Sequence, residues 1–461
     1  MSSNKNNNNI ELITGDPKRA IRKLSVPMMV SMLLIKAYNL ADSIWVAGLG
    51  SDALAAIGFI TPLFMIIVGL GNGVGAGANS LIARYIGAKN KGGADNSALH
   101  AVIMSIIISI IFSVIIIIFL KPILELMGAG SSITYAMEYG TITFAFLIVF
   151  VFSGVASAIF RSEGDVKRAT YAIAVTAVLN IILDPIFIYV FNLGIAGAAW
   201  ATILSASISC IIMIYWIWGK KDLYLDLNRN NFKYNTHIVI ETLKVAIPST
   251  AENFVISILA MVMNGFLVIC GGTDGVAVYT AAMRIIQIAM IPLIGLGTAL
   301  ITVVGVAYGS HNYKNLSTGY NYSLILGFVI SAILGVILII FSNQIAFAFS
   351  YSSSSAYLAP KISDALKILS LFVLAVPLGI MSSMTFQGVG KGTTSLIITL
   401  LRSLIFEMVF AYLFAFTFNL GTIGIYIGVV LGCGVGCIIG LILTKIYIRS
   451  LKNEAKIKYN E

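Results

Sequence analysis

Charged side chains are scarce in this sequence. They make up 10% of its 461 residues, while 59% are hydrophobic and the mean hydropathy is +0.96. Soluble domains contain roughly 25% charged residues, so this composition excludes a water-soluble protein and predicts a polytopic membrane protein. The net charge of +10 would suggest a nucleic-acid partner in a soluble chain. Here an excess of Lys and Arg in cytoplasmic loops explains it, and no nucleic-acid partner is expected.

Cysteine and histidine are also rare. The four cysteines lie in or near apolar segments without a CxxC pair, which favours small buried hydrophobes over disulfides or metal ligands. The three histidines are far apart and form no HExxH array, and no nucleophile–base pair is apparent, so we predict no enzyme activity and no cofactor. The polar N-terminal segment has no apolar core and is not a signal peptide, so the first span acts as the membrane signal.

Apolar stretches of about 20 residues mark the membrane spans. We predict an all-α integral membrane protein of twelve transmembrane helices, over residues 24–46, 54–80, 97–120, 132–158, 169–190, 195–217, 240–269, 276–303, 318–341, 362–386, 394–418 and 422–446. Basic residues gather in both tails and in every second loop, whereas the alternate loops hold few beyond Lys121 and Lys361. This bias predicts a multi-pass protein of the cell membrane with both termini in the cytoplasm.

An internal repeat divides the chain in two. Residues 48–90 align without gaps on residues 270–312, and Asn192-Leu193-Gly194 matches Asn419-Leu420-Gly421. The repeat unit is six spans, an even number, so both halves insert in the same direction around an axis along the membrane normal.

The repeat predicts three parts of the chain. We expect an N-lobe over residues 1–217, a polar cytoplasmic linker over residues 218–236 and a C-lobe over residues 237–461. Pro27 and Pro248 open matched helices of the two lobes. A proline inside a span removes one helical hydrogen bond, so each is either a bending point or a static kink.

Two aspartates, Asp42 and Asp184, interrupt segments that otherwise read as membrane spans. A carboxylate at bilayer depth costs about 2.5–3.5 kcal/mol on insertion scales, so it marks a functional site by default. Asn180 lies one turn before Asp184 on the same helical face. A rise of 1.5 Å per residue places Asp42, Asp184 and Thr202 all in the outer half of the bilayer core. One cluster is therefore geometrically possible, although Asp42 could instead be a hydrated, inert residue at the outer interface.

Other polar residues lie near these acids or in the second half. Tyr38 and Asn39 lie one turn before Asp42, and Pro185 predicts a distorted turn with freed carbonyls beside Asp184. Lys36 is a cation deep in the first span, about 120° around the helix from Asp42. The C-lobe has its own intramembrane polar set: Glu252, Arg284, Gln287, Arg402 and Glu407. Internal ion pairs of Arg402 or Arg284 with Glu407 or Glu252 are an alternative to a functional role.

Several short segments, taken in order, carry a resemblance to a known family. They are Ser43-Ile44-Trp45-Val46-Ala47-Gly48-Leu49-Gly50, Ala53-Leu54-Ala55-Ala56-Ile57-Gly58, Ala83-Arg84-Tyr85-Ile86-Gly87-Ala88, Arg161-Ser162-Glu163-Gly164, and Leu183-Asp184-Pro185 through Asn192-Leu193-Gly194-Ile195-Ala196-Gly197-Ala198-Ala199. Over roughly residues 16–450 the chain resembles the multidrug and toxic compound extrusion (MATE) transporters, and within them the DinF-type branch. The resemblance implies two pseudo-symmetric six-helix lobes, V-shaped around a central cavity, that alternate between outward and inward access.

The resemblance also implies roles for particular residues. In DinF-type proteins, the residues corresponding to Asp42, Asn180, Asp184 and Thr202 form the ion-coupling site, with Tyr139 nearby. Glu252 lies where the NorM-type branch tends to place acids. Lys36 is a departure from the family pattern, because that cavity-facing region is usually uncharged, and it argues against a simple organic cation as the cargo.

These observations predict a secondary active antiporter.

 

The antiporter would export drugs, toxins or amphipathic metabolites, with inward H⁺ or Na⁺ as the driving ion. Asp42 and Asp184 could exchange a proton, or both carboxylates could join Asn180 and Thr202 as oxygen ligands of Na⁺. The expected partners are a small-molecule substrate and membrane lipid, and a monomer is expected.

The alternative is a flippase for lipid-linked oligosaccharides or lipids, from the wider superfamily to which these transporters belong. A flippase would need a cavity rich in basic residues for a pyrophosphate, and Lys36, Arg284 and Arg402 are the candidates.

Overall fold

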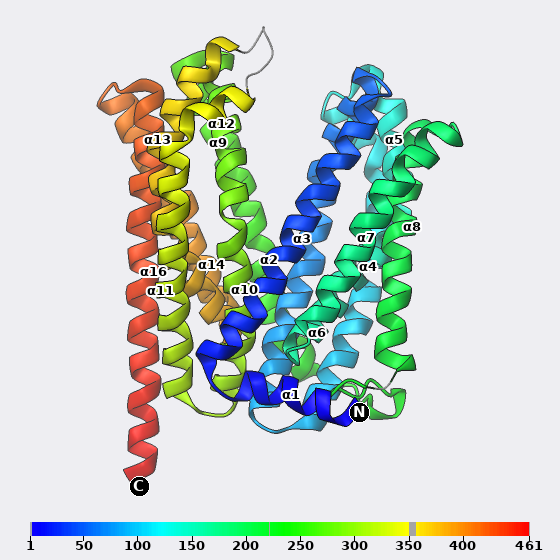
Figure 1. Cartoon of the computed structure of the whole chain (residues 1–461), viewed down its shortest axis with the longest axis vertical. Helices are drawn as coiled ribbons and strands as arrows, with labels where there is room; N and C mark the ends of the chain where they lie inside the picture. The colour runs from blue at the N-terminus through cyan, green and yellow to red at the C-terminus, as the bar shows by residue number, and fades with distance from the viewer. Residues whose placement is uncertain (1, 221, 350–355, 461) are drawn as a thin grey trace. The chain divides into compact units, whose positions relative to one another are not determined.

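The structure, a computed structural model, describes residues 2–220, 222–349 and 356–460. The described chain is helical (Figure 1). Its α-helices are α1 (Ser2–Thr14), α2 (Pro17–Ala47), α3 (Ser51–Gly87), α4 (Lys91–Leu126), α5 (Ile133–Ala145), α6 (Leu147–Ser162), α7 (Val166–Pro185), α8 (Gly194–Ile214), α9 (Thr236–Ala289), α10 (Ile291–Gly309), α11 (Tyr313–Ile340), α12 (Ser342–Phe349), α13 (Ala359–Gly388), α14 (Gly392–Thr399), α15 (Glu407–Tyr412) and α16 (Gly421–Asn460). Four π-helical segments extend or join them: η2 (Ile186–Val190), η3 (Tyr215–Gly219), η6 (Leu400–Phe406) and η7 (Leu413–Thr417).

Within the described residues, eleven helices are long and apolar enough to cross a membrane. The bent pair formed by Gly130–Ala145 and Leu147–Ser162, with a 48° angle between its parts, brings the number to twelve. This agrees with the predicted twelve spans and the all-α class. The seventh and eighth spans divide where the prediction places their boundary, because α9 is interrupted by a non-helical residue at Gly272, between residues 269 and 276. A further break at Met290, inside the predicted eighth span, separates α9 from α10.

The chain forms two compact units. The first unit comprises residues 1–16 and 26–250, and the second comprises residues 17–25 and 251–461. Two helices therefore contribute to both units: α2, which changes unit next to Pro27, and α9, which changes unit next to Pro248. The boundary lies later in the chain than the predicted linker at residues 218–236.

Glycines on α3 explain why the first part of α9 belongs to the first unit. A Cβ atom added at Gly73 would collide with Thr250 and the Ala246 carbonyl, and one at Gly77 would collide with the Thr242 carbonyl. The Thr250 hydroxyl is also 3.3 Å from the Gly69 carbonyl. Small residues allow two helix backbones to approach closely in a membrane protein, so residues up to Thr250 pack on α3.

The predicted linker segment also packs on the first unit. Side chains of α4 and α7 hold it through five contacts: Asp95 Oδ1 with the Asp226 amide (2.9 Å), Asn96 with the carbonyl (2.8 Å) and amide (3.1 Å) of Lys233, His100 Nε2 with the Asn235 amide (3.1 Å), and Arg168 with the Asp222 carboxylate (2.6 Å). Because these contacts satisfy backbone groups as well as side chains, the segment is a docked part of the first unit.

The sequence repeat reappears as matched backbone conformations. Positive φ angles occur at Gly50 and Gly272, at Lys89 and His311, at Asn192 and Asn419, and at Gly194 and Gly421. Asn90 and Asn312 each begin a helix and accept a hydrogen bond from a backbone amide three residues later, at 2.9 and 3.0 Å. An Asn at this position satisfies an amide that the helix leaves without a partner. The two halves therefore use the same local signals at the same places.

A row of glycines on α16 sets the packing of the second unit. A Cβ atom added at Gly428 would collide with Ala411, one at Gly432 with Glu407, and one at Gly436 with Arg402. These glycines recur every four residues and so share one face of α16. Their absence of side chains brings the backbone of residues 402–411 against α16 and buries Arg402 and Glu407.

Candidate functional site

Three of the predicted site residues meet inside the first unit. Asn180 and Asp184 lie one turn apart on α7, and both are fully buried. Asn180 Nδ2 donates to Asp184 Oδ1 and to Thr202 Oγ1 of α8, each at 3.1 Å. The Thr202 hydroxyl in turn donates to the Ala198 carbonyl at 3.0 Å. Helices α7 and α8 thus present a carboxylate, an amide and a hydroxyl to one point.

Asp42 of α2 and Tyr139 of α5 lie close to this cluster. The Asp42 carboxylate interacts electrostatically with Asp184. Tyr139, which is 9% exposed, interacts electrostatically with both carboxylates and with Tyr38. Four helices of the first unit, α2, α5, α7 and α8, therefore contribute polar side chains to the same region, so the single cluster that the sequence allowed is formed.

The cluster holds oxygen atoms that have no hydrogen-bond partner in the described part of the chain. They are Asp42 Oδ1, Asn180 Oδ1 and Asp184 Oδ2, and all three are buried. Burying an acceptor without a partner costs about 1–3 kcal/mol, and more for a charged group. A bound proton or a hard cation would satisfy such acceptors, because protons bind carboxylates and hard cations prefer oxygen ligands.

The surroundings of the cluster are apolar. Val46, Phe144, Ile188, Ile195 and other buried residues form the hydrophobic core that includes Tyr139. In the described residues, no group of three or more His, Cys, Asp or Glu side chains is placed to hold a metal ion. A cation at the cluster would therefore need the amide of Asn180 and the hydroxyl of Thr202 in addition to the two carboxylates.

The backbone is irregular on both sides of the cluster. The α-helical part of α7 ends at Pro185, directly after Asp184, and the π-helical segment η2 follows. π-Helical turns occur often at functional sites. On α2, the Pro27 carbonyl accepts hydrogen bonds from the hydroxyls of Ser31 at 2.9 Å and Thr170 at 3.0 Å. These contacts tie the middle of α2 to α7.

The remaining predicted residues of α2 are less enclosed. Tyr38 is half-buried, whereas Lys36 and Asn39 are exposed on the first unit. The Asn39 carbonyl accepts a hydrogen bond from Ser43 Oγ at 2.9 Å. Neither the Lys36 ammonium nor the Asn39 amide belongs to the hydrogen-bonded cluster of Asn180.

Glu252 has a second polar cluster around it, in the second unit. Its Oε1 accepts a hydrogen bond from Ser395 Oγ at 2.6 Å, and Gln387 Nε2 lies 3.4 Å from both carboxylate oxygens and 3.2 Å from Ser395 Oγ. Neither Gln387 nor Ser395 is among the residues that the sequence predicts for a site. Both are single uncharged polar residues at the ends of predicted spans. Because they are far from Glu252 in the sequence, helical periodicity does not predict their contact with it.

The other four residues of the C-lobe polar set are not joined to one another by ion pairs. Arg402 and Glu407 are buried, but no Arg402 nitrogen lies within 4.0 Å of a carboxylate oxygen in the described residues. Arg402 instead interacts with the Cys437 thiol. Arg284 and Gln287 are exposed on α9. The internal ion pairs that were the alternative to a functional role are therefore not formed within 4.0 Å among the described residues.

Comparisons with known proteins agree with this fold. A family model described as MatE matches residues 27–186 and 248–413. The chain is 26% identical to the "Probable multidrug resistance protein YoeA" of Bacillus subtilis (strain 168) over 75% of this chain and 76% of that protein. It is 25% identical to the "Multidrug export protein MepA" of Staphylococcus saprophyticus over 83% and 84% of the two chains.

Solved structures of transporters are similar over nearly the whole chain. One, from Pyrococcus furiosus, is described as "Reverse polarity of binding pocket suggests different function of a MOP superfamily transporter". Its TM-score is 0.93 at 39% identity, over 96% of this chain and 98% of that chain. Together with the family match over most of the length, this similarity shows that the chain belongs to the MATE family of membrane transporters and is not an enzyme.

Proposed function

We propose that this protein is a secondary active antiporter of the cell membrane, with both termini in the cytoplasm. It exports drugs, toxins or amphipathic metabolites, and the inward movement of H⁺ or Na⁺ through the cluster of Asp42, Asn180, Asp184 and Thr202 drives the export. The observation that carries the proposal is that three buried oxygens of this cluster have no hydrogen-bond partner among the residues that the structure describes.

Binding of a proton or Na⁺ to the cluster changes the charge that is buried inside the first unit. With two carboxylates ionised, the cluster places negative charge in an apolar environment, which is costly. A proton or Na⁺ removes this cost and also neutralises the repulsion between Asp42 and Asp184. A ligand shifts a conformational equilibrium only if it binds the two conformations with different affinity. We therefore infer that the conformation favoured by the bound ion and the conformation favoured without it differ in their affinity for cargo.

The names of the relatives support the proposed class of cargo. YoeA and MepA are named for multidrug resistance and multidrug export. The Pyrococcus furiosus protein is described by a binding pocket of reversed polarity. The exposed Lys36 adds a cation to α2 of the present chain, and it supports a cargo that carries an acidic group next to its apolar part.

The flippase alternative loses one of its three basic candidates. Arg402 is buried in the second unit and faces the Cys437 thiol and the glycine row of α16. It is therefore unable to reach a pyrophosphate without rearrangement of that packing. Antiport remains the better-supported function.

Transport by purified protein in proteoliposomes tests the proposal. Efflux of a fluorescent amphipathic dye is followed under an inward Na⁺ gradient at equal pH and, separately, under an inward H⁺ gradient without Na⁺. We expect one gradient to drive efflux in the natural protein and Asp42→Asn or Asp184→Asn to abolish the coupled part. Glu138→Gln removes an exposed carboxylate of α5 next to Tyr139 and should keep coupling. If both Asn variants showed the same rate of ion-driven dye efflux as the natural protein, the proposal would be refuted.

A further inference from the structure

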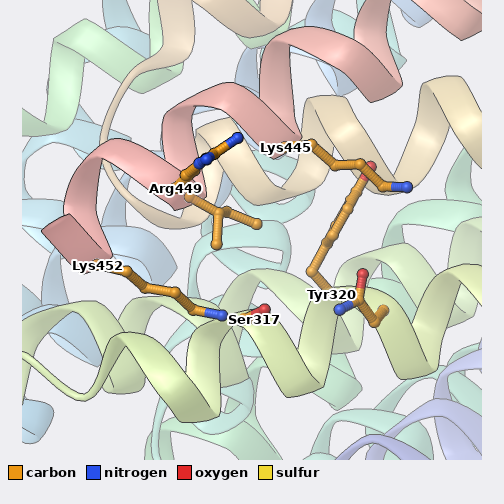
Figure 2. A pocket seen from close by; sticks show the side chains of 7 residues that line it. Ser317, Tyr320, Lys445, Arg449 and Lys452 are labelled. Carbon is orange, nitrogen blue, oxygen red and sulfur yellow. The ribbon is translucent and has the colours of Figure 1, made fainter.

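A polar pocket of about 290 Å³ lies between α11 and α16 in the second unit, away from the residues discussed above. Lys445, Arg449 and Lys452 of α16 line it. In Figure 2 these three side chains extend from α16, while Ser317 and Tyr320 come from α11. Tyr320 is buried, and its hydroxyl is 3.1 Å from Ser382 Oγ, so its ring forms a fixed part of the wall.

The three cations share one face of α16. At about 100° per residue, Lys445, Arg449 and Lys452 fall within an arc of roughly 60°. Like charges three or four residues apart repel each other on a helix. Glu454 does not offset this repulsion, because it lies on the opposite face, about 180° from Lys445. Among the described residues, none of the three cations has a carboxylate oxygen within 4.0 Å. The pocket therefore has an excess of positive charge that an anion would neutralise.

The pocket lies where the apolar parts of both helices end. Residues 421–444 of α16 contain no charged side chain, and they span roughly 36 Å at 1.5 Å per residue. Residues 322–340 of α11 likewise contain none and span roughly 28 Å. The hydrocarbon core of a bilayer is about 30 Å thick. Lys445 and Asn321 are thus at the level of the lipid headgroups.

Exposed apolar side chains continue from the pocket along both helices. Ile325 of α11 lies one turn from Asn321 and is 62% exposed, while Ile438 and Ile442 of α16 are 49% and 50% exposed. Ile438 and Ile442 lie within about 60° of Lys445 around α16. A ligand with an anionic head and apolar chains would contact the basic pocket with its head and the exposed apolar side chains with its chains. A free anion would contact the basic pocket alone.

We propose that this pocket binds the phosphate-bearing headgroup of an anionic membrane lipid, with the acyl chains along the apolar faces of α11 and α16. Arg449 would bind two phosphate oxygens at once, since a guanidinium matches this geometry, and the two lysines would add charge and donors. Ser317 and Asn321 supply further polar groups on the opposite wall. Basic pockets between transmembrane helices on the cytoplasmic side are a recognised setting for anionic headgroups, and the loop charges predict a cytoplasmic location for this end of α16.

Native mass spectrometry of the full chain, titrated with cardiolipin, phosphatidylglycerol or phosphatidylcholine, tests this site. We expect the anionic lipids to bind more tightly than phosphatidylcholine, and the double variant Arg449→Gln/Lys452→Gln to weaken their binding by roughly tenfold or more. The matched control is Lys314→Gln/Lys456→Gln, which removes two exposed cations from the same helix ends outside the pocket. It should change the affinity by less than about twofold. The exchange variant Arg449→Lys/Lys452→Arg keeps the charge and should retain most of the binding.

Two results would overturn the assignment. One is equal loss of lipid binding in the pocket variant and in the control variant, since general attraction to the basic surface would then explain it. The other is inorganic phosphate alone, at millimolar concentration, raising the melting temperature as much as the lipid does and preventing lipid binding, because a soluble anion would then be the ligand. A melting temperature of the double variant close to that of the natural protein confirms that the variant is folded.

Discussion

Asn180 joins Asp184 to Thr202 through a single amide nitrogen, which lies 3.1 Å from an oxygen of each. The amide nitrogen therefore fixes the distance between a carboxylate of α7 and a hydroxyl of α8. In the described part of the chain, the amide oxygen of Asn180 and the second carboxylate oxygen of Asp184 have no hydrogen-bond partner. This arrangement presents oxygen acceptors to an ion while the Asn donors are already engaged. Removal of the Thr202 hydroxyl by substitution therefore tests the site without altering any charge.

Thr202→Val should weaken ion coupling without unfolding the protein. The substitution removes one oxygen from the cluster and nearly preserves shape, so we expect the concentration of driving ion at half-maximal efflux to rise by about tenfold, which corresponds to about 1.4 kcal/mol. Thr176→Val is the matched control, because within the described residues the Thr176 hydroxyl donates only to the Ala172 carbonyl of its own helix. Ion titrations of efflux in proteoliposomes measure both variants. An equal rise of this ion concentration in both variants would show that the Thr202 hydroxyl is not part of the ion site.

Glu163 makes the docking of the segment after α8 dependent on pH. Its Oε2 accepts hydrogen bonds from the amides of Tyr224 and Leu225 at 3.1 and 3.3 Å. Burial raises the pKa of this carboxyl from about 4.5 to about 8. The docked state thus keeps a proton that an exposed carboxyl would lose, so its stability is fully present below pH 4.5 and is lost as the pH rises through about 8.

Hydrogen exchange of residues 222–227 between pH 5 and 9 checks this dependence, after correction for intrinsic exchange rates. Protection should fall as the pH rises in the natural protein. Glu163→Gln carries no titratable group and should show protection that is independent of pH over the same range. A natural protein whose protection increases with pH would contradict the expected sign.

Gly436→Ala should destabilise the second unit. A Cβ atom at this position would collide with the Arg402 backbone, and such overpacking costs about 1–3 kcal/mol. Gly434 lies two residues earlier on α16 and has no atom within 4 Å of an added Cβ, so Gly434→Ala should be neutral or slightly stabilising through its helix propensity. Melting temperatures in detergent compare the two variants. Equal values for both would mean that the close approach at Gly436 is relaxed at little cost.

Ser395→Ala should destabilise the Glu252 cluster. The substitution removes a donor that lies 2.6 Å from Glu252 Oε1, and loss of a hydrogen bond to a buried carboxyl costs about 1–2 kcal/mol. Ser370→Ala is the control, since in the described part of the chain the Ser370 hydroxyl donates only to the Lys367 carbonyl one turn earlier. Thermal unfolding measures the difference, and a Ser395 variant as stable as the Ser370 variant would show that Gln387 alone suffices as the donor for Glu252.

The amino-acid sequence predicts much of the fold because the determining signals are local. Runs of apolar residues define the helices, and the matched turns at Gly50 and Gly272 follow from glycines whose positive φ is readily adopted. The four-residue spacing of Asn180 and Asp184 also predicts their contact, since such residues face each other on any helix. The break at Met290, inside the predicted eighth span, was less predictable, because no polar loop marks it in the sequence.

By itself the sequence determined a helical membrane protein with two similar halves and acids inside its spans. Only the tertiary structure decided that α8 places Thr202 on Asn180, that Gln387 and Ser395 meet Glu252, and that α9 changes unit after Thr250. The physical reason is that helix periodicity fixes which residues share a face, whereas the partner of that face depends on close packing between segments far apart in the chain. Glycines such as Gly73 and Gly436 allow this packing because a neighbouring helix backbone lies where their side chains would be. The sequence does not show which backbone that is.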